Sequence, residues 1–246
     1  MEETIFGINP VLEMLKSQPE RVHQLFLPHG TLKGKKKLIF SLARQHNIKI
    51  HLIPRSRFNQ IAGNEAHQGV VGIILPYSYQ PLEALLEHWK RSREKALFLI
   101  LDGITDPQNF GAIARSACTV GAHGIIISKH RSAPINKVAV KASAGAFSYI
   151  PVCRVTNLVS VIETLKKEGI WIIGTSEEAK LSLYAQDFNS DLVIIIGSEG
   201  KGLSSSVKKH CDFLFSIPTQ GEISSLNAAV ATGVVLYEVW RQRHYN

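Results

Sequence analysis

Three segments of this sequence place glycine and polar residues directly after apolar runs, where the strands of a sheet would end. They are residues 102–111, 197–203 and 217–227. Ligands of open parallel sheets bind beyond the carboxyl ends of the strands, so the three segments are predicted to meet at one site. The side chains in or just after these segments that could do chemistry are two amides, a guanidinium, a carboxylate and a hydroxyl: Asn109, Arg115, Glu199, Ser225 and Asn227.

Two common nucleotide-binding patterns do not fit these segments. A Walker-type phosphate loop needs lysine directly after its second glycine; Gly197 and Gly202 have the right spacing, but Leu203 follows. A dinucleotide-binding turn needs three closely spaced glycines after the first strand, and only Gly103 stands at that place. ATP hydrolysis and NAD chemistry are therefore not indicated. The glycines favour a neutral or cationic small ligand that the backbone approaches closely, although a tight turn without a ligand uses glycine in the same way.

Alternating apolar runs and amphipathic stretches predict an α/β chain with a first domain over 1–76, a linker over 77–95 and a second domain over 96–246. Near-continuous apolar strands separated by helices are typical of a parallel sheet covered on both faces, which we expect in the second domain. Its predicted strands are 96–101, 124–127, 149–152, 170–174, 192–196 and 213–217, and its predicted helices are 110–120, 137–144, 158–167, 204–210 and 225–243. In the first domain the predicted strands are 23–27, 48–53 and 70–75, with helices at 10–15, 35–46 and 57–62.

Composition and charge narrow the class of protein. With 246 residues, 45% hydrophobic and 20% charged, the chain is long and apolar enough to bury a core. The formal net charge is +8, and residues 1–95 hold 14 Lys/Arg against 8 Asp/Glu, a net of +6. This excess favours a polyanion such as RNA as partner, although a solvated basic surface would give the same count. The candidate RNA-binding cations are Lys33, Lys35, Lys36, Lys37, Arg55 and Arg57.

The sequence also indicates a compartment. No apolar run approaches the ~18 residues that a membrane helix needs, and the start Met1-Glu2-Glu3 is acidic where a secretory signal would be basic. The three cysteines are odd in number and far apart, which predicts neither a disulfide framework nor a metal site. We expect a cytoplasmic protein that binds no membrane.

The motifs resemble those of a known family. The run from Asp106 to Arg115, the run from Gly197 to Leu203 and the run from Ile217 to Asn227 are similar to motifs 1, 2 and 3 of the SpoU/TrmH (SPOUT) RNA ribose 2′-O-methyltransferases, in the same order. The resemblance extends over essentially the whole chain. Residues 6–7, 65–69 and 130–136 resemble the bacterial members that act on large-subunit ribosomal RNA.

This resemblance implies a fold and a cofactor that the residue pattern alone does not. It implies a ribosomal-protein-like α/β first domain that binds RNA, and a parallel-sheet α/β second domain in which S-adenosylmethionine sits in a trefoil knot. It implies a homodimer in which both subunits shape each site. The catalytic set carried over is Asn109, Arg115, Glu199, Ser225 and Asn227, and the cofactor-contacting positions are Gly197, Gly202, Ile217 and Leu226.

Plainer roles remain open for several of these residues. Asn109 and Ser225 stand where helices are predicted to begin, so each could simply be an N-cap. Arg115 has been proposed in the family as the proton acceptor, but a guanidinium stays protonated in proteins, so we favour a phosphate and ribose anchor. Glu199 could be an exposed loop acid.

The leading prediction is methylation of a guanosine 2′-OH in 23S ribosomal RNA. The alternatives are the same reaction on transfer RNA, an antibiotic-resistance methylase of ribosomal RNA, and a non-catalytic RNA-binding protein on the same scaffold. No DNA partner is expected. The sequence does not name the target nucleotide.

Overall fold

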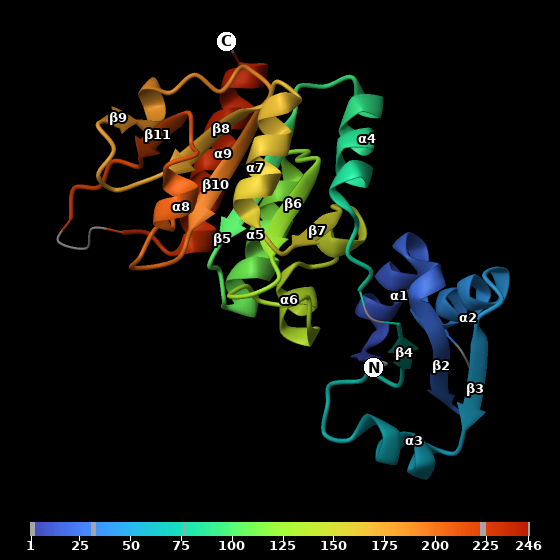
Figure 1. Cartoon of the computed structure of the whole chain (residues 1–246). Coiled ribbons are helices and arrows are strands. Elements are labelled where there is room, and N and C mark those ends of the chain that lie inside the picture. Colours follow the sequence, from blue (N-terminus) through green and yellow to red (C-terminus); the bar gives the residue numbers. More distant parts are fainter. Residues whose placement is uncertain (1–2, 31–32, 76, 222–224, 246) are drawn as a thin grey trace. The chain divides into compact units, whose positions relative to one another are not determined.

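The computed structural model describes residues 3–30, 33–75, 77–221 and 225–245. The chain divides into two compact units, Met1–Ser78 and Tyr79–Asn246. Each unit has its own sheet and its own buried core (Figure 1).

The first unit is a four-stranded sheet in the order β1-β4-β2-β3. The strand pairs β1–β4 and β4–β2 are antiparallel, and β2–β3 is parallel. Sequence analysis missed β1, a four-residue strand that pairs with β4 and has little pattern of its own. The elements are β1 (Glu3–Phe6), α1 (Ile8–Ser17), β2 (Val22–Pro28), α2 (Lys35–Gln45), β3 (Lys49–Ile53), α3 (Arg55–Ala62) and β4 (Val71–Ile74), with a 3-10 turn at Pro19–Arg21.

The second unit carries a seven-stranded sheet in the order β7-β6-β5-β10-β8-β11-β9. Every neighbouring pair in it is parallel, as the apolar strands predicted. Its strands are β5 (Leu97–Asp102), β6 (Gly124–Ser128), β7 (Val152–Val155), β8 (Trp171–Thr175), β9 (Leu181–Ser182), β10 (Leu192–Gly197) and β11 (Phe213–Ser216). Its helices are α4 (Leu82–Ser92), α5 (Pro107–Thr119), α6 (Lys137–Ala142), α7 (Leu158–Lys167), α8 (Ser205–Lys208) and α9 (Ala228–His244), with 3-10 turns at Ala146–Ser148 and Leu183–Ala185.

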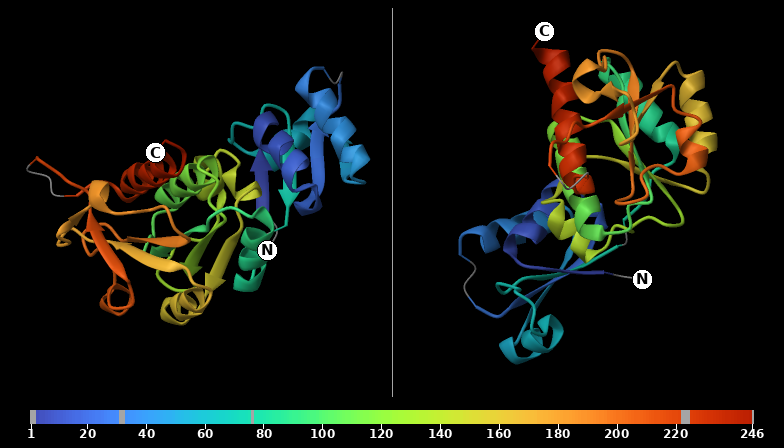
Figure 2. Two further views of the ribbon diagram at one scale, coloured as in Figure 1. Left: turned by 90° about the horizontal axis from the view of Figure 1, so that it is seen from above. Right: turned by 90° about the vertical axis from the view of Figure 1, so that its left-hand side faces the viewer.

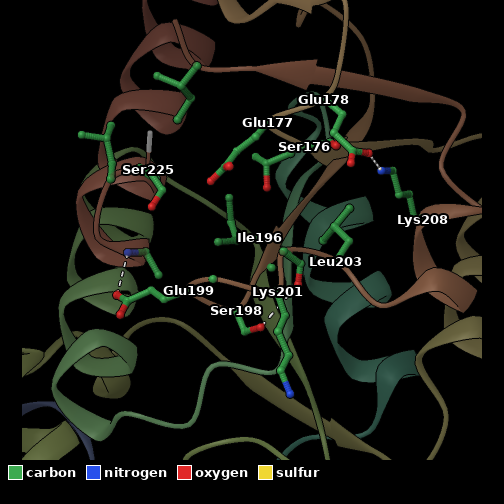
Figure 3. Close-up of a pocket in the computed structure, with 18 of the residues that line it drawn as sticks. Ser176, Glu177, Glu178, Ile196, Ser198, Glu199, Lys201, Leu203, Lys208 and Ser225 are labelled. Carbon is green, nitrogen blue, oxygen red and sulfur yellow. Dashed lines mark hydrogen bonds and ion pairs between the residues drawn. The ribbon is translucent and has the colours of Figure 1, made fainter. Parts of the chain in front are cut away.

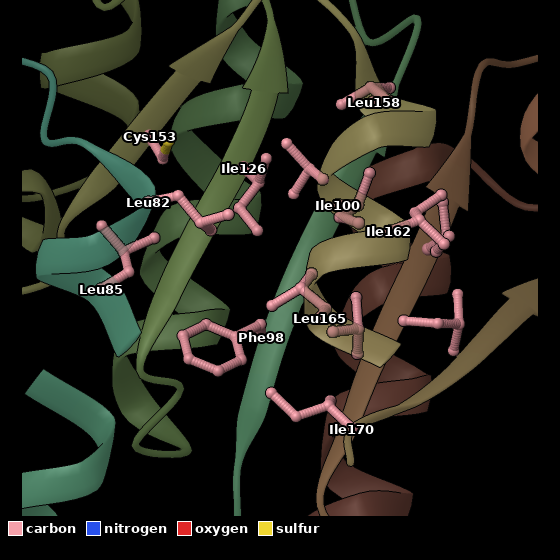
Figure 4. Close-up of a cluster of buried hydrophobic side chains, with 14 of the residues drawn as sticks. Leu82, Leu85, Phe98, Ile100, Ile126, Cys153, Leu158, Ile162, Leu165 and Ile170 are labelled. Atoms are coloured by element: carbon pink, nitrogen blue, oxygen red, sulfur yellow. The ribbon is translucent and has the colours of Figure 1, made fainter. Parts of the chain in front are cut away.

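Helices cover both faces of this sheet. Figures 1 and 2 show α4, α7 and α8 on one face and α5 and α9 on the other. Side chains from α4 and α7 interlock with the inward side chains of the central strands, as Figure 4 shows for Leu85, Phe98 and Leu165. The stretch 77–95, which sequence analysis placed between the domains, contains α4, whose Leu82, Leu85 and Leu86 join this core.

Two predicted boundaries in the second unit are wrong. The strand expected at 149–152 begins only at Val152, because Tyr149 is exposed in the turn after a 3-10 helix. The helix expected from 225 begins at Ala228, because Asn227 has extended backbone and caps it. The loop before α9 therefore keeps Ser225 and Leu226 outside the helix.

Polar side chains at the amino edge of this sheet bond mainly to backbone. Arg243, near the end of α9, donates to the carbonyl oxygens of Phe188, Lys95, Ala96 and Ser190 at 3.2, 3.0, 2.8 and 2.7 Å. Since α9 begins at the carboxyl edge and ends here, it runs the full depth of the sheet.

His123, just before β6, also forms hydrogen bonds at the amino edge. It is buried; its Nδ1 accepts from the backbone N–H of Leu97 at 3.2 Å, and its Nε2 lies 3.0 Å from Ser92 Oγ. Because the backbone N–H occupies Nδ1, the ring proton is on Nε2. Burial lowers the pKa of His123 below its usual 6.5.

None of the helices within the described residues is long and apolar enough to cross a membrane. The trefoil knot that the family resemblance implies stays a prediction.

Candidate active site

Three side chains from distant parts of the chain bond to one another at the carboxyl edge of the second sheet. Asn109 Nδ2 and Asn227 Nδ2 donate to Glu199 Oε1 at 3.0 and 2.7 Å, and Asn227 Nδ2 also donates to Asn109 Oδ1 at 2.9 Å. The backbone N–H of Ala228 donates to the same Glu199 oxygen at 3.0 Å. The three segments predicted to meet are thus confirmed to meet. We call Asn109, Glu199 and Asn227 the polar trio.

Helix starts fix two members of the trio. Asp106 caps α5 by accepting from Gln108 N at 2.9 Å, with Pro107 at the first helical position. Asn109 therefore lies in the first turn of α5, and the alternative that it is simply the N-cap is wrong, as it is for Ser225, because Asn227 caps α9. Asn227 is itself the N-cap of α9, because its Oδ1 accepts from two backbone N–H groups while its Nδ2 serves the trio.

The loop that carries Glu199 is held by close backbone contacts. Ser198 and Gly202 exchange two backbone hydrogen bonds, of 3.1 and 2.9 Å, so the chain turns back on itself around Glu199. A Cβ at Gly197 would collide with the backbone of Gly202 and Leu203, so only glycine fits there. The buried Asp102, at the end of β5, accepts from the Ser204 N–H at 2.7 Å and secures the far side of the loop.

A pocket of about 280 Å³ lies beside the trio (Figure 3). Its walls include every position predicted to contact a cofactor, together with the predicted catalytic residues Glu199 and Ser225. The cofactor positions are Gly197, Gly202, Ile217 and Leu226. The pocket therefore presents glycine backbone and aliphatic surface, as expected for a ligand that is not gripped by a phosphate loop.

One wall of this pocket was missed by sequence analysis. The end of β8 and the residues after it, 175–178, line the pocket, and Lys208 of α8 closes that side through an ion pair of 2.7 Å to Glu178. Lys208 lowers the pKa of Glu178, which is a surface carboxylate. Figure 3 shows the carboxyl group of Glu177 directed into the pocket. No motif marks this wall in the sequence; it follows from the strand order, in which β8 lies next to β10 and ends at the same edge.

Arg115 and Ser225 lie apart from the trio. Arg115 is exposed on α5, six positions and about 9 Å of helix rise beyond Asn109. Its side chain makes no hydrogen bond or ion pair to another residue of the described ranges. Ser225 is exposed at the pocket wall and bonds to no member of the trio.

Burial leaves two of the thiols of this unit unreactive. It raises the pKa of Cys153 and of Cys211 to about 11, so both stay protonated at neutral pH. Neither lines the pocket. The chemistry of the pocket therefore rests on its oxygen and nitrogen groups.

The six predicted RNA-binding cations lie in the first unit. Lys33 precedes α2, three lysines fill its first turn, and Arg55 and Arg57 stand in the first turn of α3. Lys35 Nζ donates to Asn9 Oδ1 at 2.8 Å and so also ties α2 to α1. Lys36 is half-buried, whereas Lys33, Lys37, Arg55 and Arg57 are exposed.

Comparison with known proteins finds similarity along the whole chain. The chain is 42% identical over 240 residues to YacO of Bacillus subtilis, described as a TrmH family tRNA/rRNA methyltransferase, with 98% of this chain and 96% of that protein covered. It is 39% identical to the 23S rRNA (guanosine-2′-O-)-methyltransferase RlmB of Escherichia coli, over 99% of this chain and 100% of that one. The crystal structure of the SpoU methyltransferase AviRb from Streptomyces viridochromogenes, in complex with its cofactor AdoMet, matches with a TM-score of 0.83 at 26% identity, over 100% of this chain and 92% of that one.

Family models divide the chain in the same way as the structure. The model for RNA 2′-O ribose methyltransferase substrate binding matches residues 4–80. The model of the SpoU rRNA methylase family matches residues 96–237, which hold the polar trio and its pocket. With that match and relatives this similar over the full length, the chain belongs to the SpoU rRNA methylase family.

Proposed function

We propose that this protein transfers a methyl group from S-adenosylmethionine to the 2′-OH of a guanosine in 23S ribosomal RNA. The observation that carries the proposal is the polar trio at the mouth of a glycine-lined pocket. The 23S activity named for the Escherichia coli relative supports the choice of RNA. So does the substrate-binding match over the first unit.

The pocket fits the cofactor chemically. Its backbone and aliphatic walls, from Gly197, Ile217 and Leu226, suit an uncharged adenine and the methylene groups of the cofactor, and the carboxylate of Glu177 suits a cation. When bound, S-adenosylmethionine supplies an electrophilic methyl group on a positively charged sulfur. The residues of the pocket have to hold that methyl in line with the attacking oxygen, which is where most of the rate enhancement of such a displacement arises.

The trio acts as a rigid positioning device for the ribose. Glu199 Oε1 accepts three hydrogen bonds, so that oxygen is committed to fixing Asn109 and the start of α9. Asn109 Nδ2 uses one proton in the trio and has a second to offer to a ribose oxygen. Because these groups are already ordered by one another, little reorganisation is needed when the sugar arrives.

Charge in the first unit supports RNA binding there. The first turns of α2 and α3 contain lysine or arginine and no acid. Cations at a helix N-terminus oppose the helix dipole, so this placement costs folding free energy. The same placement attracts phosphate, which is the reason we infer for keeping it.

We also propose a homodimer formed through α9. Val230 and Tyr237 lie seven positions apart, on one face of the helix, and are 53% and 55% exposed, while Val235 and Val239 on the other face are buried. A helix that is apolar on both faces is typical of one covered on both faces, and a second copy of the chain would cover it. Arg115 is exposed on α5, which packs against α9, so a dimer would place it near the partner subunit.

Val230→Glu should convert the dimer to a monomer in light scattering coupled to size-exclusion chromatography. Leu52→Glu, on an exposed apolar residue of the first unit, is the control and should leave the mass unchanged. A wild-type monomer would overturn this part of the proposal.

Methyl transfer is tested directly with tritiated cofactor and protein-free 23S RNA or bulk transfer RNA as acceptors. Label should enter 23S RNA, and Asn109→Ala and Arg115→Ala should abolish incorporation without loss of fold. Alkaline cleavage mapping then locates the methylated ribose, and a guanosine is expected. Label that enters only transfer RNA would overturn the choice of 23S RNA as substrate. Absence of heat in a calorimetric titration with S-adenosylmethionine would overturn the proposal that the protein is an enzyme that uses this cofactor. A cytoplasmic location is part of the proposal, because it is where this RNA is found.

A further inference from the structure

The loop after β6, residues 129–135, holds an arginine in a strained backbone conformation. Arg131 has φ of 59°, in the left-handed region that residues with a Cβ rarely adopt. Its side chain is exposed, and no hydrogen bond or ion pair links it to the rest of the described chain. Strain at an exposed residue with no partner persists only when neighbouring contacts impose it, and such residues concentrate at functional sites.

A frame of hydrogen bonds imposes this conformation. Ser128 Oγ bonds to the carbonyl oxygen of His130 and lies 2.9 Å from Ser132 Oγ, so the two serines bracket Arg131. Further along the loop, the Ala133 N–H donates to Ile104 O at 2.8 Å. The position of Arg131 is therefore set by the fold and not by its own side chain.

The frame ties Arg131 to the edge that carries the trio. β6 lies beside β5 in parallel register, with Ile127 opposite Leu101, so the loops after both strands emerge at the same edge. The bond from Ala133 reaches the β5 loop, which leads directly into α5 and Asn109. In the strand order, β6 lies on one side of β5, and the strands that end at the cofactor pocket, β10 and β8, lie on the other.

The chemistry at this place suits a phosphodiester. Lys129 and His130 are also exposed, and no carboxylate within the described part of the chain pairs with either. The neighbouring Arg154 is already engaged, since it donates to Lys129 O at 3.0 Å and lies over the ring of Tyr79. Arg131 thus offers a free planar guanidinium, the group that binds phosphate in a bidentate manner.

We propose that Arg131 binds a backbone phosphate of the RNA strand next to the ribose that is methylated, on the side of the trio away from the cofactor. The proposal rests on the proposed RNA substrate. It makes Arg131 a positioning residue: it orders the strand across the trio and takes no part in bond making.

Arg131→Ala tests this in the full-length protein, with a 23S RNA fragment that contains the mapped target. KM for RNA should rise about tenfold, while kcat at saturating RNA and the calorimetric Kd for S-adenosylmethionine stay within about twofold. The slope of log Kd for RNA against log salt concentration should fall by about one, because one phosphate contact is lost. Arg131→Lys should recover part of the affinity.

Arg93→Ala is the matched control. Arg93 is also exposed, also has a positive φ, of 60°, and belongs to the same unit, but it ends α4, which leads to the opposite edge of the sheet. Its replacement should leave KM and the salt slope unchanged. Arg131→Gly separates the effect of the lost charge from the effect of the backbone strain. It should lose RNA affinity like the alanine variant, yet be at least as stable to denaturant as the wild type, because glycine adopts a positive φ without strain.

The inference would be overturned if Arg131→Ala kept the wild-type KM and salt slope. It would also be overturned if Arg93→Ala lost as much RNA affinity as Arg131→Ala. Failure of the proposed function would look different, because the wild-type protein itself would then not methylate the RNA.

Discussion

The two edges of the seven-stranded sheet use polar side chains in opposite ways. At the amino edge, Arg243 and His123 bond to backbone groups at the entries of the strands. At the carboxyl edge, the trio bonds side chain to side chain, the carboxyl group of Glu177 is directed into the pocket, and Arg131 is exposed. A polar group that is satisfied by backbone serves the fold, whereas groups that order one another beside a pocket are available for a substrate. This difference predicts which substitutions change activity and which change stability.

Asn227→Ala should have the largest effect, on activity. Asn227 caps a helix and also belongs to the trio. Asn157 caps α7 in the same way, by accepting from two backbone N–H groups, and its side chain has no part in the site. Loss of either cap should cost about 1 kcal/mol of unfolding free energy. Only Asn227→Ala should also reduce kcat, on the order of 100-fold, because Asn109 and Glu199 each lose the bond from Asn227 and are held less firmly. Denaturant titrations and single-turnover methylation measure both quantities, and an equal loss of activity in Asn157→Ala would remove the distinction.

Arg243→Ala should show the reverse pattern. It removes the guanidinium that donates to four carbonyl oxygens at the amino edge, of which Ala96 O keeps a bond from the Leu192 N–H, so we expect a loss of about 2 kcal/mol in unfolding free energy. The rate per folded molecule should stay near the wild-type value. Arg91→Ala, which removes only an exposed ion pair to Glu87, should cost less than about 1 kcal/mol. A severe defect in kcat with normal stability would contradict the assignment of this edge to folding.

Acid should destabilise the amino edge through His123. Burial lowers the pKa of His123 in the folded state, so below about pH 6.5 the unfolded chain takes up a proton that the native protein resists. Stability is therefore complete above pH 6.5 and falls as the pH drops through the unfolded pKa towards the lower folded value. Urea unfolding between pH 8 and 5 should show stability falling below about pH 6.5, and His123→Gln should flatten that dependence.

Glu177→Gln should give the smallest effect, on cofactor affinity. Its carboxylate faces a pocket proposed to hold a sulfonium, but it is exposed to solvent, so we expect a loss of only about threefold. Titration calorimetry should show a smaller change for S-adenosylhomocysteine, which lacks the positive charge on sulfur. Glu87→Gln, on the outer face of α4, provides the control. An equal loss of affinity for S-adenosylmethionine and S-adenosylhomocysteine would mean that Glu177 does not act through its charge.

Local patterns predicted the parallel sheet well and its fine boundaries poorly. Apolar runs such as those of β5 and β10 indicate buried strands because both of their faces are covered. Tyr149 misled the strand assignment because β propensity does not reveal a turn set by a preceding 3-10 helix. The two residues of β9 are too few to produce any periodicity.

The candidate site shows the same limit. Motif residues predicted that Asn109, Glu199 and Asn227 would meet, because parallel strand ends share an edge. Their bonding to one oxygen depends on the loop that Gly197 and Asp102 fix, which is a tertiary feature. The pocket wall at 175–178 carries no motif and emerged only from the strand order.

The path of α9 has a consequence for how the protein is made. Asn109 and Asn227 bond across 118 residues, and the helix that Asn227 starts is fixed at its first turn by Glu199 and near its last turn by Arg243. Because chains fold as they emerge from the ribosome, most of the sheet can form while the last helix is still being synthesised. A nascent chain at that stage lacks the third member of the trio and one wall of the pocket. Methyl transfer is therefore not expected before α9 has been made, even though the first unit is by then complete.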